Sequence, residues 1–508
     1  MSVKCKILNG ICRAVYYNEY RRFMSLRDIK REQETYLFDL LRRNRDTIYG
    51  RKFRFADIHI YRDFAENVPL TKYEDYEPYI DMICRGEKAV LTSEDVLLME
   101  LTSGSSGGRK MIPYTPSLKR EFQRGIMPWL CDIYTNVKGA DVGKSYWSIT
   151  PVTQGKSFTE CGIPIGFEED SEYFGRTVQR IMNALFAVDG KVKFSRDTDT
   201  FYLDTAAQLL RCRELTLISV WSPSFLTILC GYIRDNAERL CENIPQNKRR
   251  EFMQAAKNER FDIIFPKLKI ISCWADGAAA EQVANIQRLF PNVYIQPKGL
   301  LATECFASFP IVGEEGGRLS VRSHFFEFRS LSDGKIYTAD MLQKGEYELI
   351  VTTGGGFYRY CIGDIIEVLD VYPDAPPRIR FLRRKGAVSD MFGEKLTEDF
   401  VQSTLKKLGA GSRFCLLAPE GNFYRLYTEC ADITSEMLDN ALRESYHYNY
   451  CRQLGQLDAA QVYIVSGEPQ KAYTQKLADD GMRIGDIKPC LLTNKGGWET
   501  YFERINKC

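Results

Sequence analysis

The sequence predicts an α/β protein with a large N-terminal mixed α/β domain and a small C-terminal α+β domain. Its 508 residues exceed what one hydrophobic core usually organises, so two or more domains are expected. In the middle of the chain, helix-like segments alternate with short apolar runs at residues 216–220, 269–273, 293–295 and 347–351. That alternation is typical of a mixed α/β body with a substantial sheet. Beyond residue 380 the composition changes, and the pattern becomes that of a smaller unit.

The first elements are expected to be helices. Residues 11–24 are basic and aromatic, and we expect a helix packed on the body; the alternative is a helix lying on a membrane surface. Residues 29–49 predict a second helix, because their apolar side chains fall on one face and Gly50 is a suitable stop. The apolar run 96–99 then predicts a buried strand, and residues 115–117 predict a helix start.

The C-terminal part begins where a strand near residue 381 runs into a basic, glycine-containing break. We therefore divide the chain into a domain at 1–383, a hinge at 384–392 and a small domain at 393–508. The small domain is predicted to contain strands at 414–418, 423–429 and 461–465, with a helix from about residue 435.

Composition narrows the function classes. A formal net charge of +2 gives no basic field for nucleic acid, and no apolar run approaches the length of a transmembrane helix. The sixteen cysteines form no Cys-x-x-Cys pair, and there are three histidines, which argues against a structural zinc site. Scattered cysteines without a signal peptide indicate free thiols in a reducing cytoplasm.

Residues 102–110 are the most informative segment, reading Thr-Ser-Gly-Ser-Ser-Gly-Gly-Arg-Lys. Glycines let backbone N–H groups approach an anion, hydroxyls donate hydrogen bonds, and a terminal lysine adds a point charge suited to phosphate. The loop is not a Walker A loop, which requires Gly-x-x-x-x-Gly-Lys-Ser/Thr leading into a helix. The alternative is a flexible glycine/serine linker. The candidate triphosphate-binding residues are Thr102, Ser103, Ser105, Ser106, Gly107 and Lys110.

Thr303 and Glu304 follow the predicted strand at 293–295. A carboxylate beside a hydroxyl suits Mg²⁺ that bridges phosphates, because Mg²⁺ takes one or two carboxylates and otherwise keeps water and phosphate oxygens. Glu304 is therefore the candidate metal ligand. The alternative is an ordinary exposed glutamate.

Two further candidates lie near the ends of predicted strands. Residues 352–364 combine three consecutive glycines, at 354–356, with Asp364, which would accept both hydroxyls of a ribose; the alternative is a tight hairpin with Asp364 on the surface. Lys488, next to a proline in a loop, would be delivered to a site from the small domain; the alternative is a solvated lysine. His324 is expected in the core, and Glu327, between two phenylalanines, needs a partner if it points inward.

Taken in chain order, these segments resemble the GH3 branch of the acyl-adenylate-forming superfamily, the acyl acid amido synthetases. The resemblance covers nearly the whole chain. The segments that carry it are residues 68–75, 78–80, 102–108, 326–328, 358–364, 383–395 and 488–489. The family's second motif usually reads Tyr-Gly-Ser-Ser-Glu, whereas residues 300–304 read Leu-Leu-Ala-Thr-Glu here. A leucine does not stack on adenine as tyrosine does, so another residue, from 275–280 for example, would supply that surface.

The resemblance implies a luciferase-like fold with a mobile small domain, and a ligase that uses ATP and Mg²⁺. The ligase would adenylate a carboxylic acid and pass the acyl group to an amine, with an amino acid as the expected acceptor. By the same resemblance, residues of the loop at 102–110 cradle the β- and γ-phosphates, and Thr303 and Glu304 lie beside the α-phosphate and Mg²⁺. Asp364 binds the ribose, Arg384 or Lys385 marks the hinge, and Lys488 is a catalytic residue during adenylation.

Two alternatives stay open. A coenzyme A ligase would use the same adenylate with a thiol in place of the amine, and a non-catalytic relative would bind nucleotide without turnover. The sequence does not identify the acid, and residues 145–149 and 158–162 are candidates for lining its pocket. The oligomeric state is also open.

Overall fold

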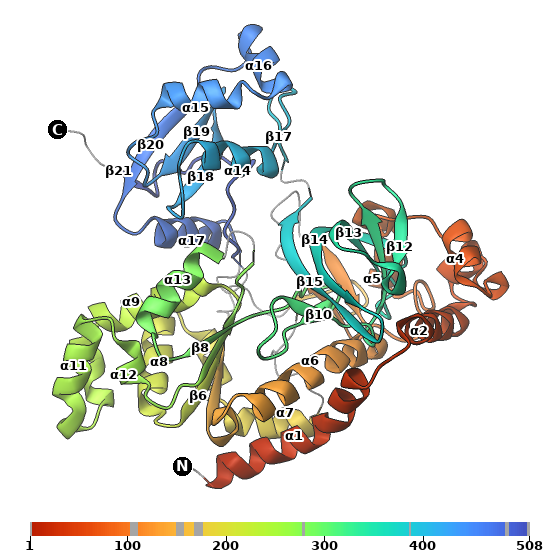
Figure 1. Ribbon diagram of the computed structural model, residues 1–508, viewed down its shortest axis with the longest axis horizontal. Helices are drawn as coiled ribbons and strands as arrows, with labels where there is room; N and C mark the ends of the chain where they lie inside the picture. Colours follow the sequence, from red (N-terminus) through yellow and green to blue (C-terminus); the bar gives the residue numbers. More distant parts are fainter. Residues whose placement is uncertain are drawn as a thin grey trace.

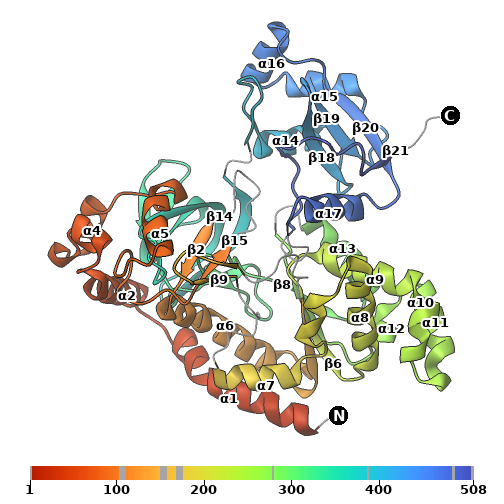
Figure 2. The ribbon, with the colours of Figure 1, turned by 180° about the vertical axis from the view of Figure 1, so that it is seen from behind.

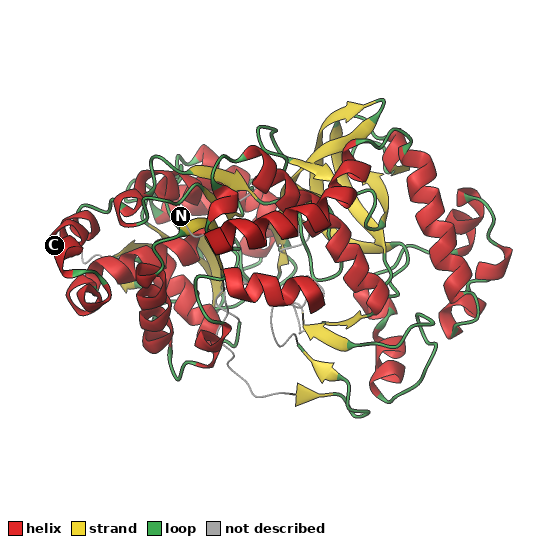
Figure 3. Cartoon of the chain, turned by 90° about the horizontal axis from the view of Figure 1, so that it is seen from below, coloured by secondary structure: helices red, strands yellow, loops and turns green. Residues whose placement is uncertain are grey.

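A computed structural model describes residues 3–101, 110–148, 157–166, 176–276, 280–385, 388–482 and 487–504. The C-terminal part stands apart from the rest of the molecule, which is divided between a parallel sheet with its helices and a larger antiparallel sheet (Figure 1). Seen from below, helices cover the near face of the body and most strands lie behind them (Figure 3). No helix in the described part of the chain is both long and apolar enough to cross a lipid bilayer.

The N-terminal helices pack on the body. Helix α1 (Val3–Met24) runs along α6 (Pro116–Asn136) and buries Cys12, Tyr16 and Phe23, so the predicted packed helix is confirmed. The single helix predicted at 29–49 is wrong, because the structure has α2 (Ile29–Asn44) and then α3 (Ile48–Lys52). Thr47 starts the second helix, since its hydroxyl accepts a hydrogen bond from the Gly50 N–H at 2.9 Å. Helices α4 (Tyr61–Asn67) and α5 (Glu77–Cys84) follow.

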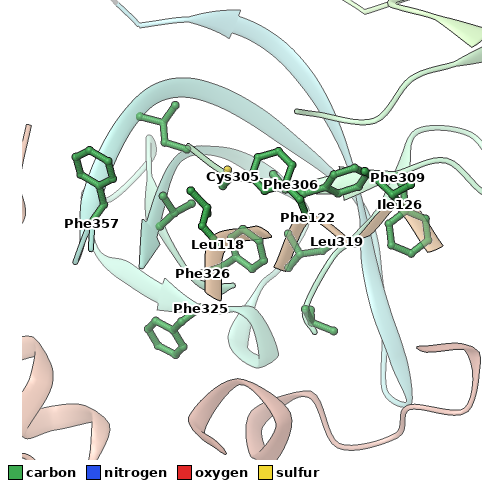
Figure 4. Packing of buried hydrophobic residues seen from close by; sticks show 14 of the residues in the cluster. Leu118, Phe122, Ile126, Cys305, Phe306, Phe309, Leu319, Phe325, Phe326 and Phe357 are labelled. Atoms are coloured by element: carbon green, nitrogen blue, oxygen red, sulfur yellow. The ribbon is translucent and has the colours of Figure 1, made fainter. Parts of the chain in front are cut away.

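The largest sheet has seven antiparallel strands in the order β12-β11-β13-β14-β15-β10-β9. Helix α6 packs on its core, where Leu118, Phe122 and Ile126 lie beside Phe306 and Phe309 (Figure 4). The strands are β9 (Ser308–Phe309), β10 (Gly317–Leu319), β11 (Phe325–Ser330), β12 (Ile336–Thr338), β13 (Gly345–Thr352), β14 (Tyr360–Tyr372) and β15 (Ala375–Arg384).

The second large sheet is parallel, with the order β3-β6-β7-β8 and a core of its own. Its strands are β3 (Lys144–Trp147), β6 (Leu215–Ser219), β7 (Ile270–Cys273) and β8 (Tyr294–Pro297), which confirms the three strands predicted there. The two central strands, β6 and β7, are short and buried throughout, as expected of a parallel sheet covered by helices. Its helices are α7 (Arg176–Leu185), α8 (Thr198–Arg211), α9 (Pro223–Asp235), α10 (Ala237–Leu240), α11 (Arg249–Lys257), α12 (Phe261–Ile264) and α13 (Ala280–Leu289).

A third, small sheet has the order β2-β1-β5-β4. It contains β1 (Leu98–Leu101), β2 (Met111–Tyr114), β4 (Ser157–Phe158) and β5 (Pro164–Ile165). The buried strand predicted at 96–99 is thus displaced by two residues, and Thr115 caps α6 as expected, its hydroxyl accepting from the Leu118 N–H at 3.1 Å.

The C-terminal part folds around two cores of its own. Figure 2 shows its helices α14, α15 and α17 beside the sheet β18-β19-β20-β21. Its strands and helices are β16 (Val388–Ser389), β17 (Leu396–Thr397), α14 (Glu398–Lys407), β18 (Cys415–Glu420), β19 (Phe423–Thr428), α15 (Ser435–Leu442), α16 (Tyr446–Gln453), β20 (Gln461–Ser466), α17 (Pro469–Asp479) and β21 (Glu503–Arg504). One of its contacts with the body is the ion pair Arg234–Glu468, at 3.7 Å.

Glu327 points inward on β11 and is 1 % exposed, so it does need a partner. The Arg359 guanidinium provides one, with Nε at 3.1 Å from both carboxylate oxygens and Nη2 at 2.9 Å from Oε1. The Tyr61 hydroxyl donates a further hydrogen bond to Oε1 at 2.8 Å. Arg359 is itself 4 % exposed, so both charges are removed from water and depend on each other.

We expect Arg359→Met to lower the free energy of unfolding by about 3–5 kcal/mol, because it leaves the Glu327 carboxylate buried without a cation. Adding Glu327→Leu to this variant is expected to recover part of the loss. Urea unfolding followed by circular dichroism measures both. The matched control is Arg62→Met, which breaks the exposed Arg62–Glu66 pair and is expected to change stability by less than about 1 kcal/mol. Equal losses in the two arginine variants would contradict this account.

Candidate active site

A tight turn at residues 301–306 carries the predicted metal-binding glutamate. Leu301 and Phe306 form a β-bridge, and the Ala302 N–H donates to the Cys305 carbonyl at 3.0 Å, which leaves Thr303 and Glu304 at the tip. Glu304 is buried, 3 % exposed, and Thr303 beside it is half-buried. The Tyr360 hydroxyl lies 3.4 Å from Glu304 Oε1 and donates to it. The alternative of an ordinary exposed glutamate is wrong.

The charges around Glu304 act on its ionisation in opposite directions. Burial raises the pKa of the Glu304 carboxyl, and the nearby Asp364 carboxylate raises it further. The cations of Arg384 and Lys110 oppose both effects without cancelling them. Glu304 therefore sits in a small cluster with two cations and a second carboxylate. A buried carboxylate with a perturbed pKa and specific charge partners is typical of a functional site.

Asp364 and Arg384 face each other across the ladder between β14 and β15. The Arg384 Nε lies 3.9 Å from Asp364 Oδ1, and Asp364 is 5 % exposed. Burial opposes the charge on Arg384, but the carboxylates of Asp364 and Glu304 together raise the pKa of its guanidinium. Asp364 thus lies inside a long strand, not on the surface of a tight hairpin as the alternative interpretation had it.

The segment 68–80 holds β2, the strand after the glycine-rich segment 102–109, against the start of β14. The Thr71 N–H donates to the Arg359 carbonyl at 3.0 Å, and the Cys361 N–H donates to the Thr71 carbonyl at 2.9 Å. The Tyr73 hydroxyl accepts from the Met111 N–H at 2.7 Å, and the Lys110 ammonium lies 5.2 Å from the centre of the Tyr73 ring. One segment therefore fixes Lys110 and the strand that leads to Asp364.

Several predicted positions lie outside the described residues. They are Thr102, Ser103, Ser105, Ser106 and Gly107 of the predicted triphosphate-binding segment, residues 277–279 of the candidate adenine segment, and Ile149. The strands on either side of the glycine-rich segment, β1 and β2, pair antiparallel, with Leu101 opposite Met111. This framework differs from the strand–loop–helix arrangement of a P-loop.

Lys488 rests against the body of the protein. Its ammonium lies 4.7 Å from the centre of the Trp274 ring, and its carbonyl accepts a hydrogen bond from the Tyr473 hydroxyl at 2.8 Å. Trp274 directly follows β7, so this lysine of the C-terminal part lies at the carboxyl end of the parallel sheet. Ligands of α/β sheets collect at that end. The structure thus brings Glu304, Asp364, Arg384 and Lys110 into one cluster and places Lys488 at Trp274.

A small apolar cavity lies at the same end of the parallel sheet, and only part of its lining was predicted from the sequence. Its volume is about 80 Å³. Trp147 and Ser148, from the segment predicted to line an acid pocket, do line this cavity, whereas Phe158 is 56 % exposed. The full lining is Phe122, Ile126, Trp129, Trp147, Ser148, Ser219, Trp221, Lys298, Gly299, Leu301, Phe306, Ser308, Phe309 and Pro310.

Sequence reasoning missed Lys298, although a signal was present. The residue lies three positions after the strand predicted at 293–295, near the strand end where ligand-binding groups of α/β sheets gather. The tryptophans gave a second signal. The chain has only five, and four of these, Trp129, Trp147, Trp221 and Trp274, lie around this end of the sheet. What the sequence could not show is that three of these rings surround one lysine.

Comparison with known proteins identifies the family. The model of the GH3 family N-terminal domain matches residues 22–258, and that of the GH3 family central domain matches residues 318–384. The indole-3-acetic acid-amido synthetase GH3.2 of Arabidopsis thaliana is 23% identical over 458 residues, covering 79% of this chain and 81% of the relative. The 4-substituted benzoates-glutamate ligase GH3.12 of the same plant is 23% identical over 421 residues, covering 73% of this chain and 72% of that protein.

The solved structure of AtGH3.15 acyl acid amido synthetase in complex with 2,4-DB superimposes with a TM-score of 0.79 at 18% identity. The superposition covers 97% of this chain and 95% of the AtGH3.15 chain, so the two proteins share their fold over almost their full lengths. The predicted fold class is therefore confirmed. From the two family models, which together match more than half of the chain, the chain belongs to the GH3 family.

Proposed function

We propose that this protein is an AMP-forming ligase that joins a small carboxylic acid to an amine, with the amino group of an amino acid as the expected acceptor. The acid's carboxylate attacks the α-phosphorus of ATP, which expels pyrophosphate and forms an acyl-AMP. The amine nitrogen then attacks the acyl carbon, which expels AMP and releases a proton, leaving an amide. The relatives in the GH3 family that are named as amido synthetases and as a glutamate ligase support this reaction class.

The observation that carries the proposal is the cluster around Glu304. Two cations, Lys110 and Arg384, lie near two buried carboxylates, Glu304 and Asp364, beside the strands that flank the glycine-rich loop. Adenylation asks little covalent chemistry of a protein and mainly requires that charges be positioned at the phosphates. We assign Lys110 and the hydroxyls of the loop to the β- and γ-phosphates, Thr303 to the α-phosphate, and Asp364 to the ribose.

Mg²⁺ fits this arrangement. Among the described residues, no group of three or more histidine, cysteine or acidic side chains converges to hold a metal by itself. Mg²⁺ suits a site with one or two carboxylates and the substrate's phosphates, and Glu304 is the buried carboxylate in position to hold it. Bound there, the ion would neutralise charge on the phosphate oxygens. The chain's own groups orient the nucleotide and exclude water.

We propose that residues 384–392 are the hinge of a mobile domain at 393–508, which carries Lys488 to the α-phosphate during adenylation. The separate cores of the C-terminal part support this division. Departure of Lys488 would then leave room for the amine. We place the reaction in the cytoplasm, because the cysteines of the described segments are free thiols.

ATP–pyrophosphate exchange with a panel of carboxylic acids tests adenylation. We expect acid-dependent exchange in the wild type and a loss of roughly a hundredfold to a thousandfold in Glu304→Ala, because a group that stabilises transition-state charge is removed. If ATP still binds but none of the acids supports pyrophosphate exchange, the proposed function is contradicted and a non-catalytic nucleotide-binding protein is favoured.

Lys488→Ala is expected to slow adenylation far more than the transfer of the acyl group from preformed acyl-AMP to the amine. The reason is that, under this proposal, the lysine is at the α-phosphate only in the conformation that performs adenylation. Single-turnover kinetics of each half-reaction measure the difference. The matched control is Lys495→Ala in the same C-terminal part, an exposed lysine near Asp480, for which both rates should stay unchanged. Equal slowing of the two half-reactions by Lys488→Ala would contradict the assigned role.

Glu304→Gln is expected to make the protein more stable at pH 8. Burial raises the pKa of Glu304 in the folded state, so above the unfolded-state pKa the ionised carboxylate costs folding free energy that glutamine does not. The gain should shrink as the pH falls and vanish below about 4, where the unfolded chain is also protonated. Thermal unfolding across this pH range measures it, with Glu66→Gln on an exposed helix as control. A lower melting temperature for Glu304→Gln at pH 8 would contradict the assignment of burial as the cause.

A further inference from the structure

Lys298 is enclosed at the carboxyl end of the parallel sheet. It directly follows β8, its backbone N–H donates to the Cys273 carbonyl at 2.8 Å, and the residue is 8 % exposed. Its ammonium nitrogen lies 4.6 Å from the centre of the Trp129 ring, 5.1 Å from that of Trp221 and 5.9 Å from that of Trp147. These rings form the wall of the cavity of about 80 Å³.

Among the residues that the structure describes, the enclosed amine finds fewer partners than a buried cation needs. The Ser219 hydroxyl accepts one of its three N–H groups at 2.7 Å. In the described segments no carboxylate comes within ion-pair distance of it, and the remaining donors face aromatic rings and the cavity. Ring faces attract a cation, but they do not replace the hydrogen bonds that water would make. Burial accordingly lowers the pKa of Lys298 to about 7, against a small opposing influence of Cys273.

The cavity connects this amine to the turn that carries Glu304. Leu301 and Phe306, which form the base of that turn, line the cavity together with Lys298. Under the proposed function the reacting carboxylate must lie near Glu304, where the α-phosphate is bound. An acid whose body fills the cavity would then have its reacting end at the turn and its other end at the enclosed amine.

We infer that Lys298 is a specificity-determining residue, which binds a second negatively charged oxygen group at the end of the acid remote from its reacting carboxylate. The inference rests on the proposed function in one respect: that function places the reacting carboxylate near Glu304, and therefore the other end of the acid at Lys298. The substrate class is a small acid with an apolar body and two anionic groups, such as a short dicarboxylic acid. A cavity of about 80 Å³ favours a compact body, since benzene occupies an engineered apolar cavity of about 150 Å³.

Binding is tested directly, without turnover, by quenching of tryptophan fluorescence with butanedioate and butanoate as the paired probes. We expect the wild type to bind the dianion roughly tenfold to a hundredfold more tightly than the monoanion, the range expected for a hydrogen bond to a charged group. Lys298→Met, which keeps the length and apolar stem of the side chain, should abolish this preference. The matched control is Lys52→Met, because Lys52 also lies over two rings, Phe53 and Tyr79, but is exposed.

A second measurement needs no variant. At pH 8 the enclosed amine is mostly neutral, so binding of the dianion should take up close to one proton per ligand, because the anion favours the ammonium form. Isothermal titration calorimetry in two buffers with different ionisation enthalpies counts that proton. Butanoate should take up much less.

The outcomes separate this inference from the proposed function. Equal affinity for the two probes in the wild type, or equal loss of both in Lys298→Met, would overturn the role of Lys298. Pyrophosphate exchange with monoanionic acids but not with dianionic ones would overturn it as well, while the proposed function stands. Dianion binding with proton uptake, in a protein that exchanges pyrophosphate with no acid, would support the site for the second anionic group and contradict the proposed function.

Discussion

The buried ion pair between Glu327 and Arg359 is the constraint on which the arrangement of the site depends. Arg359 has a left-handed backbone with φ of 50°, a conformation that a non-glycine residue keeps only when its surroundings hold it. Its guanidinium also donates to the carbonyls of Ala65 and Val68, at 2.8 and 2.9 Å. The pair therefore ties β11, the segment before residue 68 and the start of β14 together. Tyr360, the next residue, is thereby directed at Glu304.

A second buried carboxylate, Glu121 on α6, positions the other side of the site. It accepts from the Gly354 N–H at 2.9 Å and from the Tyr36 hydroxyl at 2.8 Å, and its Oε2 lies 3.0 Å from His324 Nδ1. The imidazole Nε2 in turn accepts from the Phe306 N–H at 2.9 Å, so one histidine connects Glu121 to the turn of Glu304. A Cβ at Gly354 would lie 2.3 Å from Glu121 Oε1, which explains why the chain has glycine there.

The sequence predicted three strands of the parallel sheet, β6, β7 and β8, because each contains a short apolar run that is visible locally, but it did not predict β3 (Lys144–Trp147). It also singled out Glu304 and Asp364, which the structure buries near each other, while their roles stay predictions. It did not show that Glu304 is buried against Tyr360, nor that the helix after residue 29 breaks before Thr47. Lys298 was missed because its environment is assembled from tryptophans far apart in the chain, and no local pattern reports such an enclosure.

The most direct test of the account is the product of one reaction in which acceptors compete. The protein would receive ATP, Mg²⁺, a pool of small carboxylic acids, all common amino acids and coenzyme A together, with products identified by mass spectrometry. The account predicts an N-acyl amino acid formed in equal amount with AMP. An acyl-coenzyme A thioester with no amide would contradict transfer to an amine, and formation of ADP in place of AMP would contradict adenylation itself.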